Sequence, residues 1–147
     1  MPTLTPEALI GTWELVRYFV RFADGTETAP LGEDAVGRIC YLRDGHMFGF
    51  MARAGRVPFA SADRLLATPS EKAQAFDDCV TYTGRWTLLD DGMVVHHVEL
   101  SLLPNWTGQD QLRIPRLDAL GLELAAHVGE GAARRSAIVR WKRAGKT

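Results

Sequence analysis

Two Asp-Gly pairs, each lying between strand-like segments, constrain the fold of this chain more than any other feature of its sequence. Asp44-Gly45 separates residues 36–42 from residues 47–51, and Asp91-Gly92 separates residues 80–89 from residues 94–103. Asp-Gly is a strong hairpin signal, because tight antiparallel turns need residues that accept a positive φ. The sequence therefore predicts two β-hairpins.

Further strands are expected wherever β-branched and aromatic residues gather between turn residues. They cover residues 13–22, 108–114, 120–128 and 136–142. Together with the two hairpins, they bring the expected number of strands to eight.

Two helices are also expected. A short one covers residues 4–10 and ends before Gly11. The second covers about residues 69–79, where Thr68 and Glu71 can form a capping box around Pro69. This second helix lies in the one long connection, residues 52–79.

Eight sequential antiparallel strands joined by short turns favour an all-β fold, an up-and-down β-barrel that closes on itself and leaves no sheet edge exposed. The interior of an eight-stranded barrel is just wide enough for one small ligand. We expect a single domain over residues 1–147, since no linker or repeat divides the chain. A sandwich of two sheets is the competing architecture.

Charge and hydrophobicity exclude several classes of partner. The chain has 17 Lys and Arg against 18 Asp and Glu, a formal net charge of −1. Nucleic acids and anionic membranes call for a basic excess, so neither is expected as a partner. No apolar run is long enough to span a bilayer, and the first residues do not resemble a signal peptide. We therefore expect a cytoplasmic location.

The sequence gives no sign of a metal or cofactor. Cys40 and Cys79 are the only cysteines, and we expect two small buried thiols. His96 and His97 are adjacent in a strand, so their side chains point to opposite faces and cannot hold one metal ion together. The chain contains no phosphate-binding loop, no dinucleotide fingerprint and no G-x-S-x-G motif.

The start of the first expected strand, Gly11-Thr12-Trp13, resembles the G-x-W signature of lipocalins. In that fold the Trp closes the bottom of the barrel, and an Arg on the final strand lies across it. The resemblance implies that Trp13 has this role and that Arg140, beside Trp141, is the matching arginine.

A longer resemblance involves three runs between residues 9 and 115: LIGTWELV, PLGEDAVGRICYLRDGHM and HHVELSLLPNWTGQDQLR. These are similar to the lipocalin-like domain family of bacteria and fungi, small barrels of which some members lie among natural-product biosynthetic genes. The chain lacks the disulfide pattern and further signatures of secreted lipocalins. The resemblance therefore implies the barrel fold, and not the transport of retinoid-like ligands.

A candidate site follows from folding the strands after residue 80 over their turns. A tight turn at Asn105-Trp106 would place Glu99 opposite Arg113, and a two-residue turn at Asp91-Gly92 would place Trp86 opposite His97. One face of three neighbouring strands would then carry Tyr82, Gly84, Trp86, His97, Glu99, Ser101, Gln111 and Arg113. A one-residue error in either turn would move half of these residues to the other face.

The apolar pattern does not decide which face is internal. Val98 and Leu100 favour the opposite face, which also holds His96, whereas Tyr82 and Trp86 favour the first face. We expect the first face to point inward, because its aromatic side chains are costly to leave in water.

Three residues are the catalytic candidates: His97, Glu99 and Arg113. Glu99 and Arg113 either form a cross-strand ion pair or orient a carbonyl or carboxylate group of a ligand. His97 either is an ordinary strand residue or serves as an acid or base, because its unperturbed pKa is close to neutrality. The expected ligand-binding residues are Tyr82, Trp86, Ser101, Asn105, Gln111, Met47 and Phe50.

Three functions remain open. The first is binding of one small, largely apolar molecule with a polar handle inside the barrel. The second is catalysis by a cofactor-free cyclase, isomerase or lyase that acts on a biosynthetic intermediate. The third is a structural or interaction module whose barrel is filled by its own side chains. A homodimer is one option for the oligomeric state.

Overall fold

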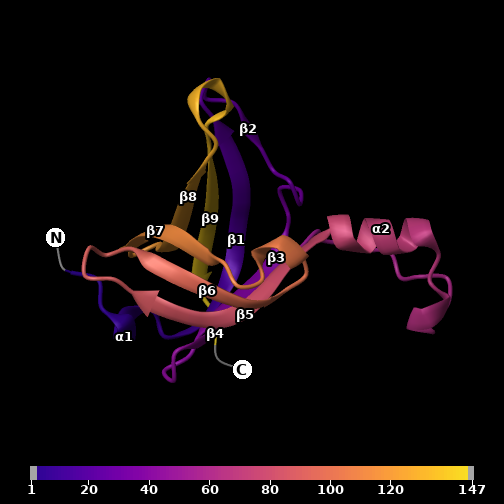
Figure 1. The fold of residues 1–147 in the computed structure, drawn as a ribbon, viewed down its shortest axis with the longest axis horizontal. Helices are drawn as coiled ribbons and strands as arrows, with labels where there is room; N and C mark the ends of the chain where they lie inside the picture. The colour runs from indigo at the N-terminus through magenta and orange to yellow at the C-terminus, as the bar shows by residue number, and fades with distance from the viewer. Residues whose placement is uncertain (1–2, 146–147) are drawn as a thin grey trace.

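The structure, a computed structural model, describes residues 3–145 and consists of a closed eight-stranded antiparallel barrel with one extra strand (Figure 1). The barrel strands are β1 (Gly11–Phe22), β3 (Val36–Tyr41), β4 (His46–Ala52), β5 (Cys79–Leu88), β6 (Val94–Ser101), β7 (Asp110–Asp118), β8 (Gly121–Val128) and β9 (Arg135–Arg143). Each strand pairs with the next, and β1 pairs with β9 to close the ring. The eight expected strands and the barrel are thus confirmed, and a two-sheet sandwich is excluded.

Several short elements accompany the barrel. The two expected helices are α1 (Pro6–Leu9) and α2 (Pro69–Asp77), and three 3-10 turns are η1 (Arg64–Leu66), η2 (Pro104–Trp106) and η3 (Gly131–Ala133). The extra strand β2 (Glu27–Thr28) pairs only with β1. Its two polar residues carry no apolar alternation, which is why the sequence did not predict it.

The closed end of the barrel is built around Trp13, which is 1% exposed. Its indole nitrogen donates a hydrogen bond to the carbonyl oxygen of Leu9, the last residue of α1, over 2.9 Å. The guanidinium carbon of Arg143 lies 4.0 Å from the centre of the Trp13 ring, and its Nη1 donates to the carbonyl of Ile10 over 2.7 Å. Gly11 has φ +127, and an added Cβ would lie 2.8 Å from that same Nη1. The Gly of the G-x-W motif therefore makes room for this arginine.

The prediction that Arg140 covers Trp13 is wrong. The β1–β9 register pairs Trp13 directly with Arg143, whereas Arg140 pairs with Arg17 beyond a bulge. Arg140 lies on the outer surface, where it forms a 3.0 Å ion pair with Glu123 and approaches the ring of Phe19. The prediction of Arg140 failed because the sequence position of an arginine does not reveal the register between the first and the last strand.

The long connection between β4 and β5 leaves the barrel wall instead of crossing its interior. An ion pair of 3.0 Å between Arg53 and Asp78 joins its two ends, and Thr68 and Glu71 form the expected capping box of α2. Figure 1 shows α2 projecting from the ends of β4 and β5. No residue between 53 and 79 lines the cavity described below.

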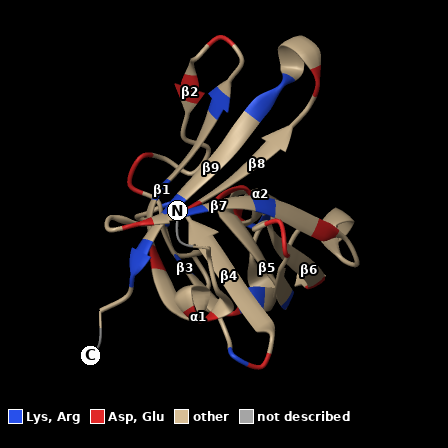
Figure 2. Cartoon of the chain, turned by 90° about the vertical axis from the view of Figure 1, so that its left-hand side faces the viewer, with Lys and Arg blue, Asp and Glu red and all other residues tan. Residues whose placement is uncertain are grey.

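Charged residues are distributed over the fold without a dominant sign. Figure 2 shows segments of Lys and Arg interspersed with segments of Asp and Glu along the strands and the turns that join them. Among the described residues, none of the helices combines the length and apolar character needed to cross a bilayer.

Candidate functional site

The turn between β5 and β6 determines which histidine enters the barrel. Leu89 and Met93 are hydrogen-bonded across a loop of residues 90–92, so the loop has one residue more than a two-residue turn. Trp86 therefore lies opposite His96 and not opposite His97. His96 is buried at 1% exposure, and the predicted inward position of His97 is wrong.

A bulge at Glu99 then restores the predicted pairing of Tyr82 with Ser101. The bulge lies beside Gly84, where an added Cβ would be 1.9 Å from the carbonyl oxygen of His97. Gly84 thus permits a close approach of the two backbones and does not open space for a ligand. The extra residue also turns Glu99 outward, where it forms a 3.5 Å ion pair with Arg85.

The predicted pairing of Glu99 with Arg113 is also wrong. Arg113 lies opposite Val94, and Gln111 lies opposite His96. The predicted tight turn is in fact a longer connection of residues 102–109 that contains η2, because Pro104 begins a 3-10 turn. His97 lies outside the barrel, with Nδ1 2.8 Å from Asp110 and Nε2 2.9 Å from Thr87.

The interior of the barrel contains a cavity of about 510 Å³. Its apolar wall comes from several strands and includes Val20, Ile39, Leu124, Val139 and Trp141. Its polar lining consists of Tyr18, Thr81, Tyr82, His96, Gln111, Arg113 and Arg135. Among the described residues, none that line it is an aspartate or a glutamate.

A chain of three side chains crosses the inner end of this cavity. The hydroxyl of Tyr41 lies 2.7 Å from Nε2 of His96, and the hydroxyl of Tyr82 lies 2.6 Å from Nδ1. Tyr41 is completely buried. Trp106 of η2 packs edge-on against the ring of Tyr82, with the ring centres 5.9 Å apart. Both ring nitrogens of His96 are therefore occupied by tyrosine hydroxyls.

Burial keeps this chain uncharged. Removal from water lowers the pKa of His96 to about 3, and the positive charge of Arg113 adds to that effect. Burial raises the pKa of Tyr41 well above its ordinary value, and it also raises the pKa of Tyr82, although the neighbouring Arg113 opposes part of that rise. At neutral pH the imidazole and both phenols are neutral hydrogen-bonding groups.

Arg113 supplies positive charge to the cavity. It is half-buried, and its two terminal nitrogens donate to the carbonyl oxygen of Leu112 over 2.9 Å and to the side-chain oxygen of Gln111 over 3.2 Å. Within residues 3–145 no carboxylate is close enough to form an ion pair with it. A guanidinium in such a position can donate hydrogen bonds to an anionic or carbonyl oxygen of a ligand.

The other expected ligand-binding residues are divided among several places. Tyr82 and Gln111 line the cavity. Met47 is completely buried in the core, and Trp86 packs on Tyr41 with its indole nitrogen donating to the carbonyl of Leu42. Asn105 is exposed in η2, next to Trp106.

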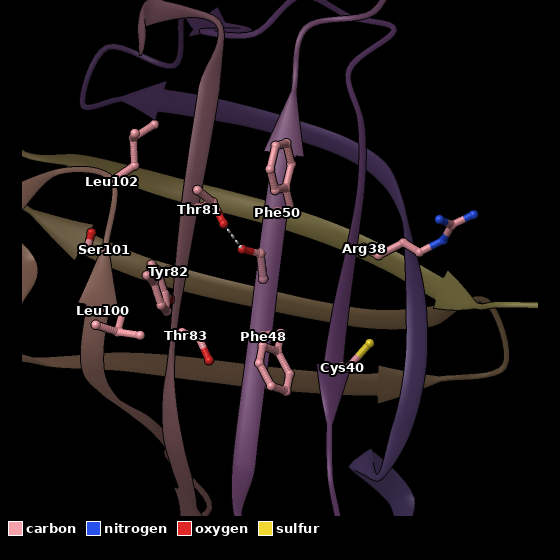
Figure 3. A pocket seen from close by; sticks show the side chains of 11 residues that line it. Arg38, Cys40, Phe48, Phe50, Thr81, Tyr82, Thr83, Leu100, Ser101 and Leu102 are labelled. Atoms are coloured by element: carbon pink, nitrogen blue, oxygen red, sulfur yellow. Dashed lines mark hydrogen bonds between the residues drawn. The ribbon is translucent and has the colours of Figure 1, made fainter. Parts of the chain in front are cut away.

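Phe50 and Ser101 border a second hollow, on the outer face of the sheet, although Ser101 pairs with Tyr82 and its hydroxyl is buried without a hydrogen-bond partner among the described residues. Figure 3 shows its side chains, which come from β3, β4, β5 and the end of β6. Phe50 borders both hollows, and its side chain is 48% exposed. Phe48 and Leu100 extend this outer apolar surface, with 51% and 69% exposure. The outer hollow holds no titratable cluster of three or more metal-ligating side chains among the described residues.

Sequence reasoning missed His96, Tyr41, Tyr18, Trp106 and Arg135 as site residues. A signal for His96 was present, because Val94 and Val98 flank it at a spacing of two and all three are buried in the structure. No comparable signal exists for Tyr41 or Tyr18, because their approach to the site depends on closure of the barrel.

Comparison with known proteins agrees with this architecture. The family model described as "Lipocalin-like domain" matches residues 10–144, which include every strand of the barrel up to the end of β9. A comparison with curated proteins finds no match. With a closed eight-stranded barrel, a buried G-x-W tryptophan and a model match over nearly its whole length, the chain belongs to the lipocalin-like domain family.

Proposed function

We propose that this protein binds one small, largely apolar molecule in its barrel, and that Arg113 holds an anionic or carbonyl oxygen of that molecule. The observation that carries the proposal is the charge of the cavity. Two arginines are among its lining residues and no carboxylate is among those described. A partly buried charge needs a partner, and an apolar ligand with an oxygen handle supplies both the missing charge and the missing packing.

The volume of the cavity supports binding over the alternative of a filled barrel. About 510 Å³ lies within the range of small-molecule sites, and most of the wall is apolar. A module filled by its own side chains would leave no such space.

A pair of fluorescent probes tests the proposal. Anilinonaphthalene sulfonate is apolar and anionic, whereas phenylnaphthylamine has a similar ring system without the charge. We expect both to bind the wild-type protein. We expect Arg113→Met to weaken binding of the sulfonate at least tenfold, about 1.4 kcal/mol, and to change binding of the neutral probe by less than about threefold.

Arg116→Met is the matched control, because Arg116 lies on the same strand but forms an exposed ion pair with Glu123. It should leave both affinities unchanged. If neither probe binds, or if Arg113→Met weakens both equally, the proposal is wrong.

Two further expectations belong to the proposal. Cys40 and Cys79 are both free thiols, which supports a reducing, cytoplasmic compartment that cell fractionation can test. The outer apolar surface around Phe48 and Leu100 supports a homodimer, which sedimentation of the wild type against Leu100→Lys can test.

Catalysis by a cofactor-free cyclase, isomerase or lyase is the second candidate function. One feature of the cavity favours catalysis: the hydroxyl of Tyr82, a hydrogen-bond donor in the cavity lining.

A further inference from the structure

We infer that the Tyr82 hydroxyl and the Arg113 guanidinium form an oxyanion hole, which stabilises negative charge on an oxygen atom of a carbonyl compound bound in the barrel. This inference rests on the proposed function, because it assigns a chemical class to the ligand of the same cavity. It also assigns an activity, activation of a carbonyl group through its enolate.

The hydrogen-bond chain directs the proton of Tyr82. Tyr41 is completely buried, and Nε2 of His96 is the partner of its hydroxyl in the described structure. Tyr41 must therefore donate to Nε2, because otherwise its buried O–H would have no acceptor. A neutral imidazole then carries its proton on Nδ1 and donates it to the oxygen of Tyr82. The O–H of Tyr82 remains free to donate into the cavity.

The same chain makes Tyr82 a donor that keeps its proton. Loss of that proton would leave a phenolate beside a neutral, buried histidine, and burial already raises the pKa of Tyr82. His96 cannot gain a proton near neutral pH, since its pKa is about 3. Preorganised donors of this kind stabilise developing charge without rearranging during the reaction.

The charged and titratable groups that face this donor are all cationic or neutral. Arg113 and Arg135 carry positive charge, and Tyr18, Tyr41 and His96 are neutral. Any negative charge that develops on a ligand oxygen is therefore stabilised. The described lining contains no carboxylate to accept a proton, so the reaction we infer uses a nucleophile that the substrate itself carries and water as the proton acceptor.

An intramolecular conjugate addition fits this set of groups. The substrate's own nucleophile forms a bond to the β-carbon of an unsaturated carbonyl, and the electron pair of the C=C bond shifts to give an enolate. Tyr82 and Arg113 stabilise the negative oxygen. The proton of the nucleophile passes to water, a water proton reaches the α-carbon, and the carbonyl group re-forms with no oxidant, reductant or cofactor.

The ionisation of bound para-nitrophenol tests the oxyanion hole directly, because only the phenolate form absorbs visible light. We expect the wild-type cavity to bind the phenolate at least tenfold more tightly than the phenol, which lowers the apparent pKa of the bound probe by one unit or more. Tyr82→Phe and Arg113→Met should each remove most of this shift. Tyr41→Phe frees His96 to change tautomer and should reduce the shift, although Tyr41 does not contact the ligand.

Arg116→Met is the matched control, since Arg116 lies on the same strand as Arg113 but forms an exposed ion pair with Glu123 outside the cavity. It should leave the shift unchanged, and all four variants should still bind phenylnaphthylamine. An unshifted pKa, no preference for the phenolate, or equal effects of Arg113→Met and Arg116→Met would overturn the oxyanion hole. Retained binding of the two fluorescent probes would then leave the binding proposal standing, whereas their failure to bind overturns both.

Discussion

The imidazole of His96 is buried, and this burial makes the stability of the fold depend on pH. The folded state resists protonation of His96 down to a pKa of about 3, whereas an unfolded chain binds that proton near pH 6.5. Above pH 6.5 both states hold a neutral His96, so its contribution to stability is fully present there. As the pH falls from 6.5 towards 3, only the unfolded state gains the proton, and stability is lost.

We therefore predict that the free energy of unfolding falls as the pH drops below 6.5, with a slope that approaches about 1.4 kcal/mol per pH unit. Urea unfolding between about pH 5 and 6.5 isolates this effect, because the carboxylates with lowered pKa values, such as Glu71 and Asp44, titrate below that interval. His96→Gln should flatten the dependence even if it lowers stability overall. His97→Gln should keep the wild-type slope, and an equally flattened slope in both variants would contradict the prediction.

At this scale the sequence predicted the types of site residue better than their identities. Tyr82, Gln111 and Arg113 were expected to share a face, and all three line the cavity. The sequence predicts that His97 and Glu99 share this face only if the turn at Asp91-Gly92 has two residues. One additional loop residue exchanges the two adjacent histidines, and no local signal distinguishes a two-residue from a three-residue loop at an Asp-Gly pair.

At the scale of elements, the pairing of β5 with β6 depends on Gly84. The backbone of His97 and Glu99 approaches so closely that no side chain fits at this position. The bulge at Glu99 accompanies this close approach, whereas the three-residue loop before β6 directs His96 inward.

We predict that Gly84→Ala costs about 3 kcal/mol or more, because backbone atoms must move to admit a methyl group. Gly49→Ala on the adjacent strand is the matched control, since its Cβ would meet only side chains at ordinary contact distance, Ile39 at 3.8 Å and Met47 at 4.0 Å. We expect that variant to stay within about 1 kcal/mol of the wild type. Chemical denaturation measures both, and similar losses in the two variants would show that the close approach at Gly84 is unimportant.

The connection of residues 53–78 joins β4 to β5 and lies outside the cavity lining. It leaves and rejoins the barrel through Arg53 and Asp78, and several of its apolar side chains are exposed, including Val57 and Leu65. Long connections of this kind are usually functional. The sequence predicts that residues 56–79 form a mobile flap, or a helix-bearing lid, over the open end of the barrel.

We predict that anilinonaphthalene sulfonate slows amide hydrogen exchange in residues 56–79 more than in the rest of the strands. Closure over an occupied cavity would bury the exposed apolar side chains, and it would protect the amides that carry them. Arg113→Met, which should weaken binding of this probe, provides the control. Equal protection in strands and connection would show that the connection does not close on a ligand.

At the scale of the whole molecule, the strand order and barrel closure could be predicted because turn residues recur at regular intervals. The register could not, because it depends on which residues of β1 and β9 meet when the two ends of the sheet come together. Arg140 and Arg143 are equally plausible partners of Trp13 in the sequence, and only the closed barrel distinguishes them.

We predict that Arg143→Met costs about 1–3 kcal/mol, since it removes a cation–π contact with Trp13 and charge-assisted hydrogen bonds to the end of α1. Arg140→Met should cost less than about 1 kcal/mol, because its ion pair is partly exposed. Trp13→Ala should cost about 3–5 kcal/mol. Unfolding midpoints in urea rank the three, and a larger loss for Arg140→Met than for Arg143→Met would contradict this assignment.

The junction of α1, Trp13 and Arg143 also has a consequence for the order of folding. During synthesis on the ribosome the strand that carries Trp13 emerges first, yet its neighbour β9 emerges last. Contacts between the most distant parts of a chain slow folding, because the intervening segment must be ordered before they form. The nascent chain therefore holds β1 with one unpaired edge and an uncovered indole until the final strand arrives, and this is the interval in which it is most exposed to chaperones and to aggregation.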